Sequence, residues 1–137
     1  MKKPVKWVLI VLFGLAAVSV PLGIYAYRSV IAMIQDCYAQ WAIAEIIISY
    51  AEENDELPTE WSSLPRYRQQ GMHHGGLSFE EIRERIIIDF DRLEELAEFI
   101  PFDAEIPEII QTTSGRESHW EGAEPNHLVN DHMARLW

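Results

Sequence analysis

The sequence has no lysine after Lys6 and a single cysteine, Cys37, among its 137 residues. One cysteine excludes a disulfide within the chain, so packing alone must stabilise the folded part. Paired-cysteine, HExxH and EF-hand patterns are absent too, which leaves no standard signature of a zinc or calcium site. Ser114 lacks the flanking glycines of a nucleophile elbow. We therefore expect a protein that is not an enzyme and binds no cofactor.

Positive charge is scarce beyond the first 28 residues. The rest of the chain carries seven arginines and all 22 acidic residues, a formal charge of −15 with histidines counted as neutral. Such a surface repels phosphate groups, which argues against nucleic acid as a partner. It favours solubility and attracts cations or cationic proteins.

Residues 7–27 form a run of 21 residues without a charge, preceded by Lys2, Lys3 and Lys6. A helix of that length measures about 31 Å, close to the hydrocarbon thickness of a bilayer. The run is longer than the apolar part of a secretory signal and continues past Ala17-Val18-Ser19, the candidate cleavage site. We therefore expect a permanent single-pass anchor, whose partner is membrane lipid, with a cleaved signal as the alternative.

The basic residues before the apolar run predict its orientation. Lysines concentrate on the cytoplasmic side of membrane helices, so residues 1–6 form a cytoplasmic flank and residues 7–27 the transmembrane helix. Residues 28–137 then make an acidic extracytoplasmic domain. The expected location is the cytoplasmic (inner) membrane.

No helix breaker occurs between Arg28 and about Glu53, so the anchor and this segment form one long helical spine. Along it, four apolar residues recur at spacings of three and four and mark one helix face: Ile31, Ile34, Tyr38 and Trp41. This face is the expected interaction site, either for envelope proteins or for self-association. Glu45 follows the rhythm of a polar stripe and is expected on a solvated face.

The remaining sequence predicts a small antiparallel sheet and short helices. Residues 85–90 read as a strand, although helix stays open for residues 86–90, and residues 108–113 read as a second strand. Ser114-Gly115 predicts a tight turn into a third strand at residues 116–120. Pro125 suits the first turn of a last helix. The expected fold class is α+β, with about three strands and short peripheral helices around the spine.

Part of the spine resembles a known family. Residues 44–50, Glu53-Asn54-Asp55 and Leu57-Pro58-Thr59 are similar to the region where type IV pilins and type II secretion pseudopilins leave their N-terminal helix. The resemblance covers about the first 65 residues and implies a non-catalytic, pilin-like part in an envelope assembly. Processed pilins carry a glutamate at the fifth position of the mature chain. If this chain were processed after Gly14, its fifth position would be Ser19, so that glutamate is missing here. Residues 119–126 resemble a stretch of uncharacterised membrane-anchored bacterial proteins.

Two alternative functions remain from the sequence. His119 and Glu121 lie two residues apart on an expected strand, so they share a side, and His127 is the next histidine along the chain. These three side chains are candidate metal ligands of a membrane-tethered metal-binding or hydrolytic domain. Ordinary surface histidines are the simpler interpretation. The other alternative is an anchored structural or regulatory protein that binds one dedicated partner.

Overall fold

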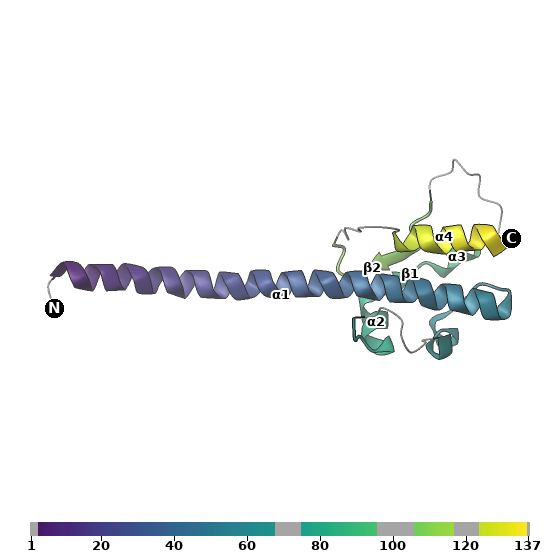
Figure 1. Cartoon of the computed structure of the whole chain (residues 1–137), viewed down its shortest axis with the longest axis horizontal. Helices are drawn as coiled ribbons and strands as arrows, with labels where there is room; N and C mark the ends of the chain where they lie inside the picture. Colours follow the sequence, from purple (N-terminus) through teal and green to yellow (C-terminus); the bar gives the residue numbers. More distant parts are fainter. Residues whose placement is uncertain (1–2, 68–74, 96–105, 117–123, 137) are drawn as a thin grey trace. The chain divides into compact units, whose positions relative to one another are not determined.

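The computed structural model describes residues 3–67, 75–95, 106–116 and 124–136 (Figure 1). Helix α1 runs over Lys3–Asn54, a length of 52 residues that includes Pro21. The chain divides into two compact units, Met1–Ile34 and Gln35–Trp137. The predicted long N-terminal helix is therefore confirmed.

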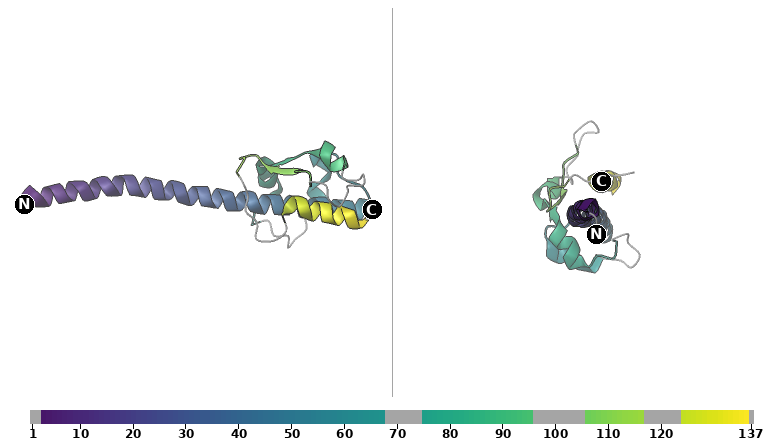
Figure 2. Two further views of the ribbon diagram at one scale, coloured as in Figure 1. Left: turned by 90° about the horizontal axis from the view of Figure 1, so that it is seen from above. Right: turned by 90° about the vertical axis from the view of Figure 1, so that its left-hand side faces the viewer.

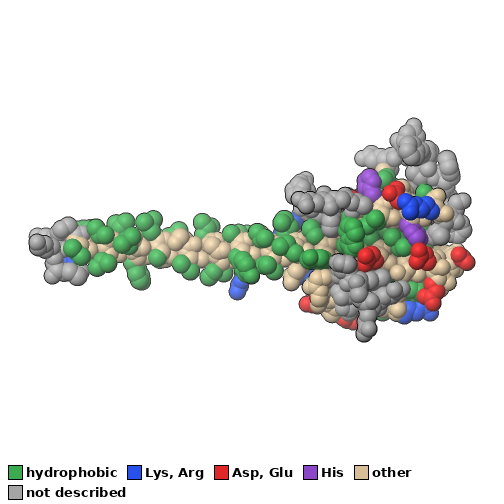
Figure 3. All heavy atoms as spheres, viewed as in Figure 1, with side chains coloured by type: hydrophobic (Ala, Val, Ile, Leu, Met, Phe, Trp, Pro, Cys, Tyr) green, Lys and Arg blue, Asp and Glu red, His purple; other side chains and the backbone are tan. Residues whose placement is uncertain are grey.

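The first unit consists of helix with outward apolar side chains. Every described side chain from Val5 to Arg28 is exposed, and Figure 3 shows hydrophobic side chains all along this part of α1. Near the N-terminus, α1 is long and apolar enough to cross a membrane. This supports the predicted anchor by length and composition.

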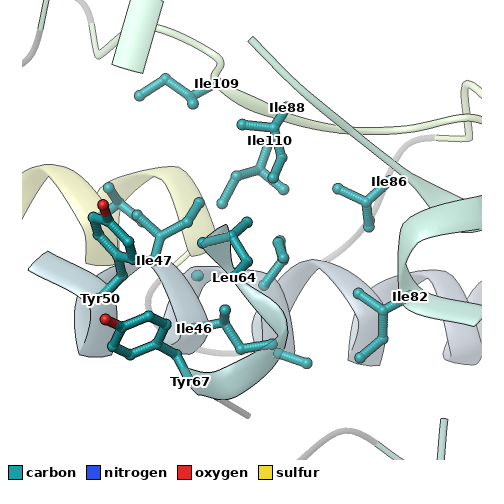
Figure 4. Close-up of a cluster of buried hydrophobic side chains, with 14 of the residues drawn as sticks. Ile46, Ile47, Tyr50, Leu64, Tyr67, Ile82, Ile86, Ile88, Ile109 and Ile110 are labelled. Atoms are coloured by element: carbon teal, nitrogen blue, oxygen red, sulfur yellow. The ribbon is translucent and has the colours of Figure 1, made fainter. Parts of the chain in front are cut away.

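The second unit has a core built around the rest of α1. Ile43, Ile46 and Ile47 are fully buried on this helix. Figure 4 shows side chains from the other elements gathered around Ile46 and Ile47. These partners include Leu64, Tyr67, Ile82, Ile86, Ile88, Leu93, Ile109, Ile110, Val129 and Met133. The spine is thus the central element of the core of this unit.

Helix α1 ends where the sequence predicts. Asp55 adopts a left-handed conformation with φ of 55°, and its N–H donates to the carbonyl of Ala51 at 3.0 Å. Such a residue closes a helix and turns the chain. Two 3-10 turns follow, η1 at Trp61–Ser63 and η2 at Pro65–Tyr67.

Helix α2, Phe79–Arg85, begins with a capping box in which Ser78 and Glu81 bond to each other's backbone N–H. Strand β1, Ile86–Ile88, follows directly, and helix α3 begins at Phe90 and ends at Glu95. The ambiguity over residues 86–90 is thus resolved: the first three are strand and Phe90 is helical.

The sheet has two strands among the described residues, where the sequence predicts about three. Strand β2, Ile110–Thr112, pairs antiparallel with β1, and Ile87 lies opposite Gln111. Residues 117–120 of the predicted third strand lie outside the described residues. The prediction of a three-stranded sheet is corrected because the side chain of Asn126 occupies the outer edge of β2 at Ile110. The α+β class holds, with a fold that is mostly helical.

Helix α4, Pro125–Leu136, lies alongside the second half of α1 (Figure 2). Val129 and Met133 bury its inner side. His132 Nε2 lies 3.3 Å from Glu52 Oε1 of α1. The apolar packing of Val129 and Met133 holds α4 against the spine, and His132 lies beside Glu52.

Candidate interaction surfaces

The apolar face predicted on the spine carries partly exposed side chains. In the first unit, Ile31 is 37% and Ile34 is 41% exposed. In the second unit, Tyr38 is 42% exposed, whereas Trp41 is half-buried and donates its indole N–H to Glu45 Oε1 at 3.1 Å. Three of the four predicted contact residues thus present apolar surface, and Trp41 is partly used within its own unit.

Tyr38 is fixed in place by a close backbone neighbour. Gly75 has a φ of +57°, and a Cβ atom on it would lie 2.7 Å from Tyr38 Cδ2. Only glycine fits both this conformation and this close approach. One side of the Tyr38 ring is therefore covered, and its exposed part has a defined orientation.

Glu45 is not on a solvated face, contrary to the sequence prediction. Its side chain is half-buried, and its Oε2 atom is buried without a hydrogen-bond partner in the described part of the chain. Periodicity alone placed it with Glu52 and Glu56, which are exposed. Burial of Glu45 reflects elements packed around α1, which helical spacing does not encode.

A buried carboxylate that the sequence analysis missed lies near the start of the second unit. Asp36 is only 3% exposed. Its Oδ1 accepts a bond from Arg85 Nη1 at 2.8 Å, and its Oδ2 accepts one from Ser114 Oγ at 2.8 Å and lies 3.7 Å from Arg116 Nη1. Arg85 also donates to Gln35 Oε1 at 2.7 Å. We call Asp36, Arg85, Ser114 and Arg116 the Asp36 network; it ties α1 to the end of α2 and to the turn after β2.

No sequence signal would have singled out the Asp36 network, because its members are far apart in the chain. Asp36 is one of 22 acidic residues, and Arg85 is one of seven arginines past the apolar run. A buried ion pair needs counterions and hydrogen bonds to offset its desolvation, and Asp36 has both. Its groups bond one another, so the network suits a positioning function better than a reaction.

A second polar cluster closes the end of α1. Asn54 Nδ2 donates to the Tyr50 carbonyl at 2.7 Å and to the Tyr67 hydroxyl at 2.6 Å. The Tyr50 hydroxyl donates to Glu56 Oε1 at 2.9 Å. Burial, followed by this hydrogen bond to the carboxylate, raises the pKa of Tyr50 above its ordinary value. The guanidinium of Arg66 lies over the Tyr67 ring, 4.7 Å from its centroid.

The candidate metal ligands are only partly described. His119 and Glu121 lie outside the described residues, so the proposed ligand set stays a prediction. His127 is exposed, and its backbone N–H donates to Glu124 Oε2 at 3.2 Å. Within the described ranges, no group of three or more His, Cys, Asp or Glu side chains is placed to hold a metal ion.

An open depression of about 510 Å³ lies beside the sheet. Its lining residues come from β1, β2, the start of α3 and the segment before η1: Thr59, Ile87, Ile88, Asp89, Phe90, Asp91, Ile109 and Gln111. Ile87 is 51% exposed and is the one large apolar side chain outside α1 that is exposed in the described part of the chain. The depression is lined by apolar side chains together with the polar side chains of Asp89, Asp91 and Gln111.

Comparison with known proteins adds no relative: no protein-family model matches the chain, and neither do any curated proteins or solved structures. The functional argument therefore rests on the surfaces described above.

Proposed function

We propose that this protein is a single-pass membrane protein, similar in plan to pilins and pseudopilins, whose acidic extracytoplasmic domain makes protein contacts in an envelope assembly. One observation carries the proposal. A single helix, α1, presents exposed apolar side chains over its first half and contributes the central core residues of a folded unit over its second half. That division of one helix is what an anchor with an attached head requires.

Exposed apolar side chains over so long a stretch support a membrane environment. Each large apolar side chain left in water costs about 1.5–3 kcal/mol relative to burial. Residues from Trp7 to Tyr27 include many such side chains, for example Phe13 at 80% exposed. Lipid removes this cost for the segment. With Lys2, Lys3 and Lys6 before it, the segment is expected to leave the N-terminus in the cytoplasm.

Lateral packing of the spine supplies the proposed assembly contact. Ile31, Ile34 and Tyr38 present apolar surface at helical spacing, close to the apolar run. Helices pack through such stripes by fitting ridges into grooves. The proposed partner is an apolar helix, either of a second copy or of another envelope protein. The buried charges of the Asp36 network are satisfied internally, which supports a non-catalytic domain.

Site-directed crosslinking in native membranes tests lateral packing. In a Cys37→Ser background, Ile34→Cys places the only thiol on the proposed face, and Ala32→Cys places it about 160° around the helix. After oxidation, we expect a disulfide-linked product from Ile34→Cys and monomer from Ala32→Cys. Monomer from both variants would remove the lateral contact, and equal crosslinking from both would show that the contact does not depend on this face.

A further inference from the structure

Two of the seven arginines past residue 28 converge on one carboxylate at the start of the second unit. Arg85 donates to Asp36 Oδ1 at 2.8 Å and to Gln35 Oε1 at 2.7 Å. Arg116 Nη1 lies 3.7 Å from Asp36 Oδ2, too far for a hydrogen bond. Within the described ranges, no other carboxylate pairs with either guanidinium. This group of three charges therefore has a surplus of one positive charge.

The surplus charge is accessible at Arg116. Its side chain is 44% exposed, compared with 28% for Arg85 and 5% for Asp36. In the described part of the chain, the Arg116 guanidinium donates no hydrogen bond, whereas both terminal nitrogens of Arg85 do. An arginine with unused N–H groups can bind a phosphate through two parallel hydrogen bonds. Asp36 thus attracts the Arg116 guanidinium without using its donors.

The position of Asp36 in the sequence keeps Arg116 near the membrane surface. From Trp7 through Gln35, Arg28 is the only charged residue. These 29 residues belong to α1 and measure about 43 Å as a helix, which matches a bilayer with both headgroup layers, about 40–45 Å. Because Asp36 follows this segment directly, the side chains that contact Asp36 stay close to the headgroups of the outer leaflet.

We propose that Arg116, supported by the charge of Arg85, binds phosphate groups of lipid headgroups and so docks the second unit on the extracytoplasmic surface of the membrane. The proposal rests on the anchoring proposed above. Charges elsewhere on the acidic domain are screened beyond about 8 Å at physiological salt, so they do not cancel an arginine in contact with a headgroup. Docking restricts how the domain tilts over the membrane, and thereby which side of the spine meets a partner.

Full-length protein in lipid vesicles tests the docking. In a Cys37→Ser background, Thr113→Cys carries a bimane label; Thr113 is exposed, and its N–H donates to the Arg85 carbonyl. The quencher is a spin-labelled lipid without phosphate. The anchor alone keeps the label near the membrane at every salt concentration, so quenching that is lost between about 0.1 M and 1 M NaCl reports an ionic contact. We expect such quenching in phosphatidylglycerol vesicles and none in vesicles of an uncharged galactolipid.

Three variants locate the contact. Arg116→Gln removes the charge and should lower the ratio of docked to undocked protein about fivefold, the effect of one arginine at an anionic surface. Arg116→Lys keeps the charge and should retain most of the docking. Arg135→Gln removes an exposed arginine from α4 and should leave the ratio unchanged. Equal salt-sensitive quenching of the Arg116→Gln variant and the original protein would overturn the proposal.

Flotation of the vesicles separates a failure of docking from a failure of the anchoring on which it rests. Protein that does not float with the vesicles in about 1 M NaCl would overturn both proposals. Protein that floats without salt-sensitive quenching would overturn the docking alone and would favour an acidic protein as the partner of Arg116. Equal salt-sensitive quenching in the galactolipid vesicles would also overturn the docking, because that lipid has no phosphate.

Discussion

Apolar side chains are exposed in one region of helix α1 and buried in another. In the unit Met1–Ile34, Trp7 and Phe13 are 69% and 80% exposed, whereas in the unit Gln35–Trp137, Ile43 and Ile46 are fully buried. Residue type does not explain the contrast, because both halves of α1 are rich in large apolar residues. What differs is the packing partner: the second half has strands, turns and α4 around it, and the proposed partner of the first half is lipid.

The largest effect should come from placing charge in the first half. The double substitution Leu15→Arg with Val18→Arg adds about 6 kcal/mol to the cost of insertion, at roughly 3 kcal/mol for each arginine near the centre of a span. We expect most of the protein to leave the alkali-resistant membrane fraction. The control pair Leu15→Ile with Val18→Leu should stay in it. Retention of the arginine variant in that fraction would contradict a membrane environment for the first half of α1.

A smaller effect is expected from a cavity in the second half. Ile46→Ala removes a fully buried side chain and should lower the free energy of unfolding of the second unit by about 3 kcal/mol. The matched change Leu15→Ala should leave that free energy unchanged, since Leu15 is exposed within the first unit. Urea unfolding in detergent, followed by tryptophan fluorescence, measures both. Similar losses would show that the two units do not unfold independently.

The third prediction concerns the stability that the Asp36 network gives to the second unit. Asp36→Asn keeps the shape of the side chain but leaves Arg85 without its counterion, so we expect a loss of about 2 kcal/mol in the free energy of unfolding. Asp131→Asn neutralises an exposed carboxylate of α4 and should change stability by less than about 0.5 kcal/mol. The same urea titration measures both, and equal effects would mean that the network adds no stability.

The smallest effect concerns alkaline pH at the end of α1. Burial and the bond to Glu56 raise the pKa of Tyr50 in the folded state, so the unfolded chain loses this proton at a lower pH. The resulting stability is full below about pH 10 and is lost as pH rises through the folded pKa. Tyr50→Phe should therefore flatten the alkaline decline in the urea midpoint, while Tyr27→Phe leaves it unchanged. An identical decline in the Tyr50→Phe variant would contradict the pKa shift.

Features that depend on near neighbours in the chain could be predicted. The charge-free run at residues 7–27 indicates a long apolar helix, and Asn54-Asp55 indicates where it ends. Ser78 followed by Glu81 is the sequence pattern of a capping box, and the two residues form one because they are three positions apart. Residues 86–88 form the predicted strand. The helix, its end and the capping box depend on groups within a few turns of one helix, and the strand is indicated by its run of β-branched residues, so local spacing and residue type are enough.

Features that depend on distant partners were missed or mispredicted. Asp36 bonds Arg85 and Ser114, which lie 49 and 78 positions further along the chain. The Glu45 side chain was predicted to be solvent-exposed because its position on the helix matches a polar stripe. Neighbouring elements instead bury part of it. Asn126 closes β2 from 16 positions away, at the edge where a third strand would pair. Helical phase and turn spacing carry no information about such contacts.

By itself, the sequence determined the length and apolar character of the first helix, where that helix stops, and the negative charge of everything after it. These follow from composition and local spacing, which act without regard to the rest of the fold. Only the tertiary structure decided which carboxylate is buried with two arginines and which sheet edge is closed. Both depend on groups brought together from distant parts of the chain, and burial removes the competing water that would otherwise satisfy each group separately.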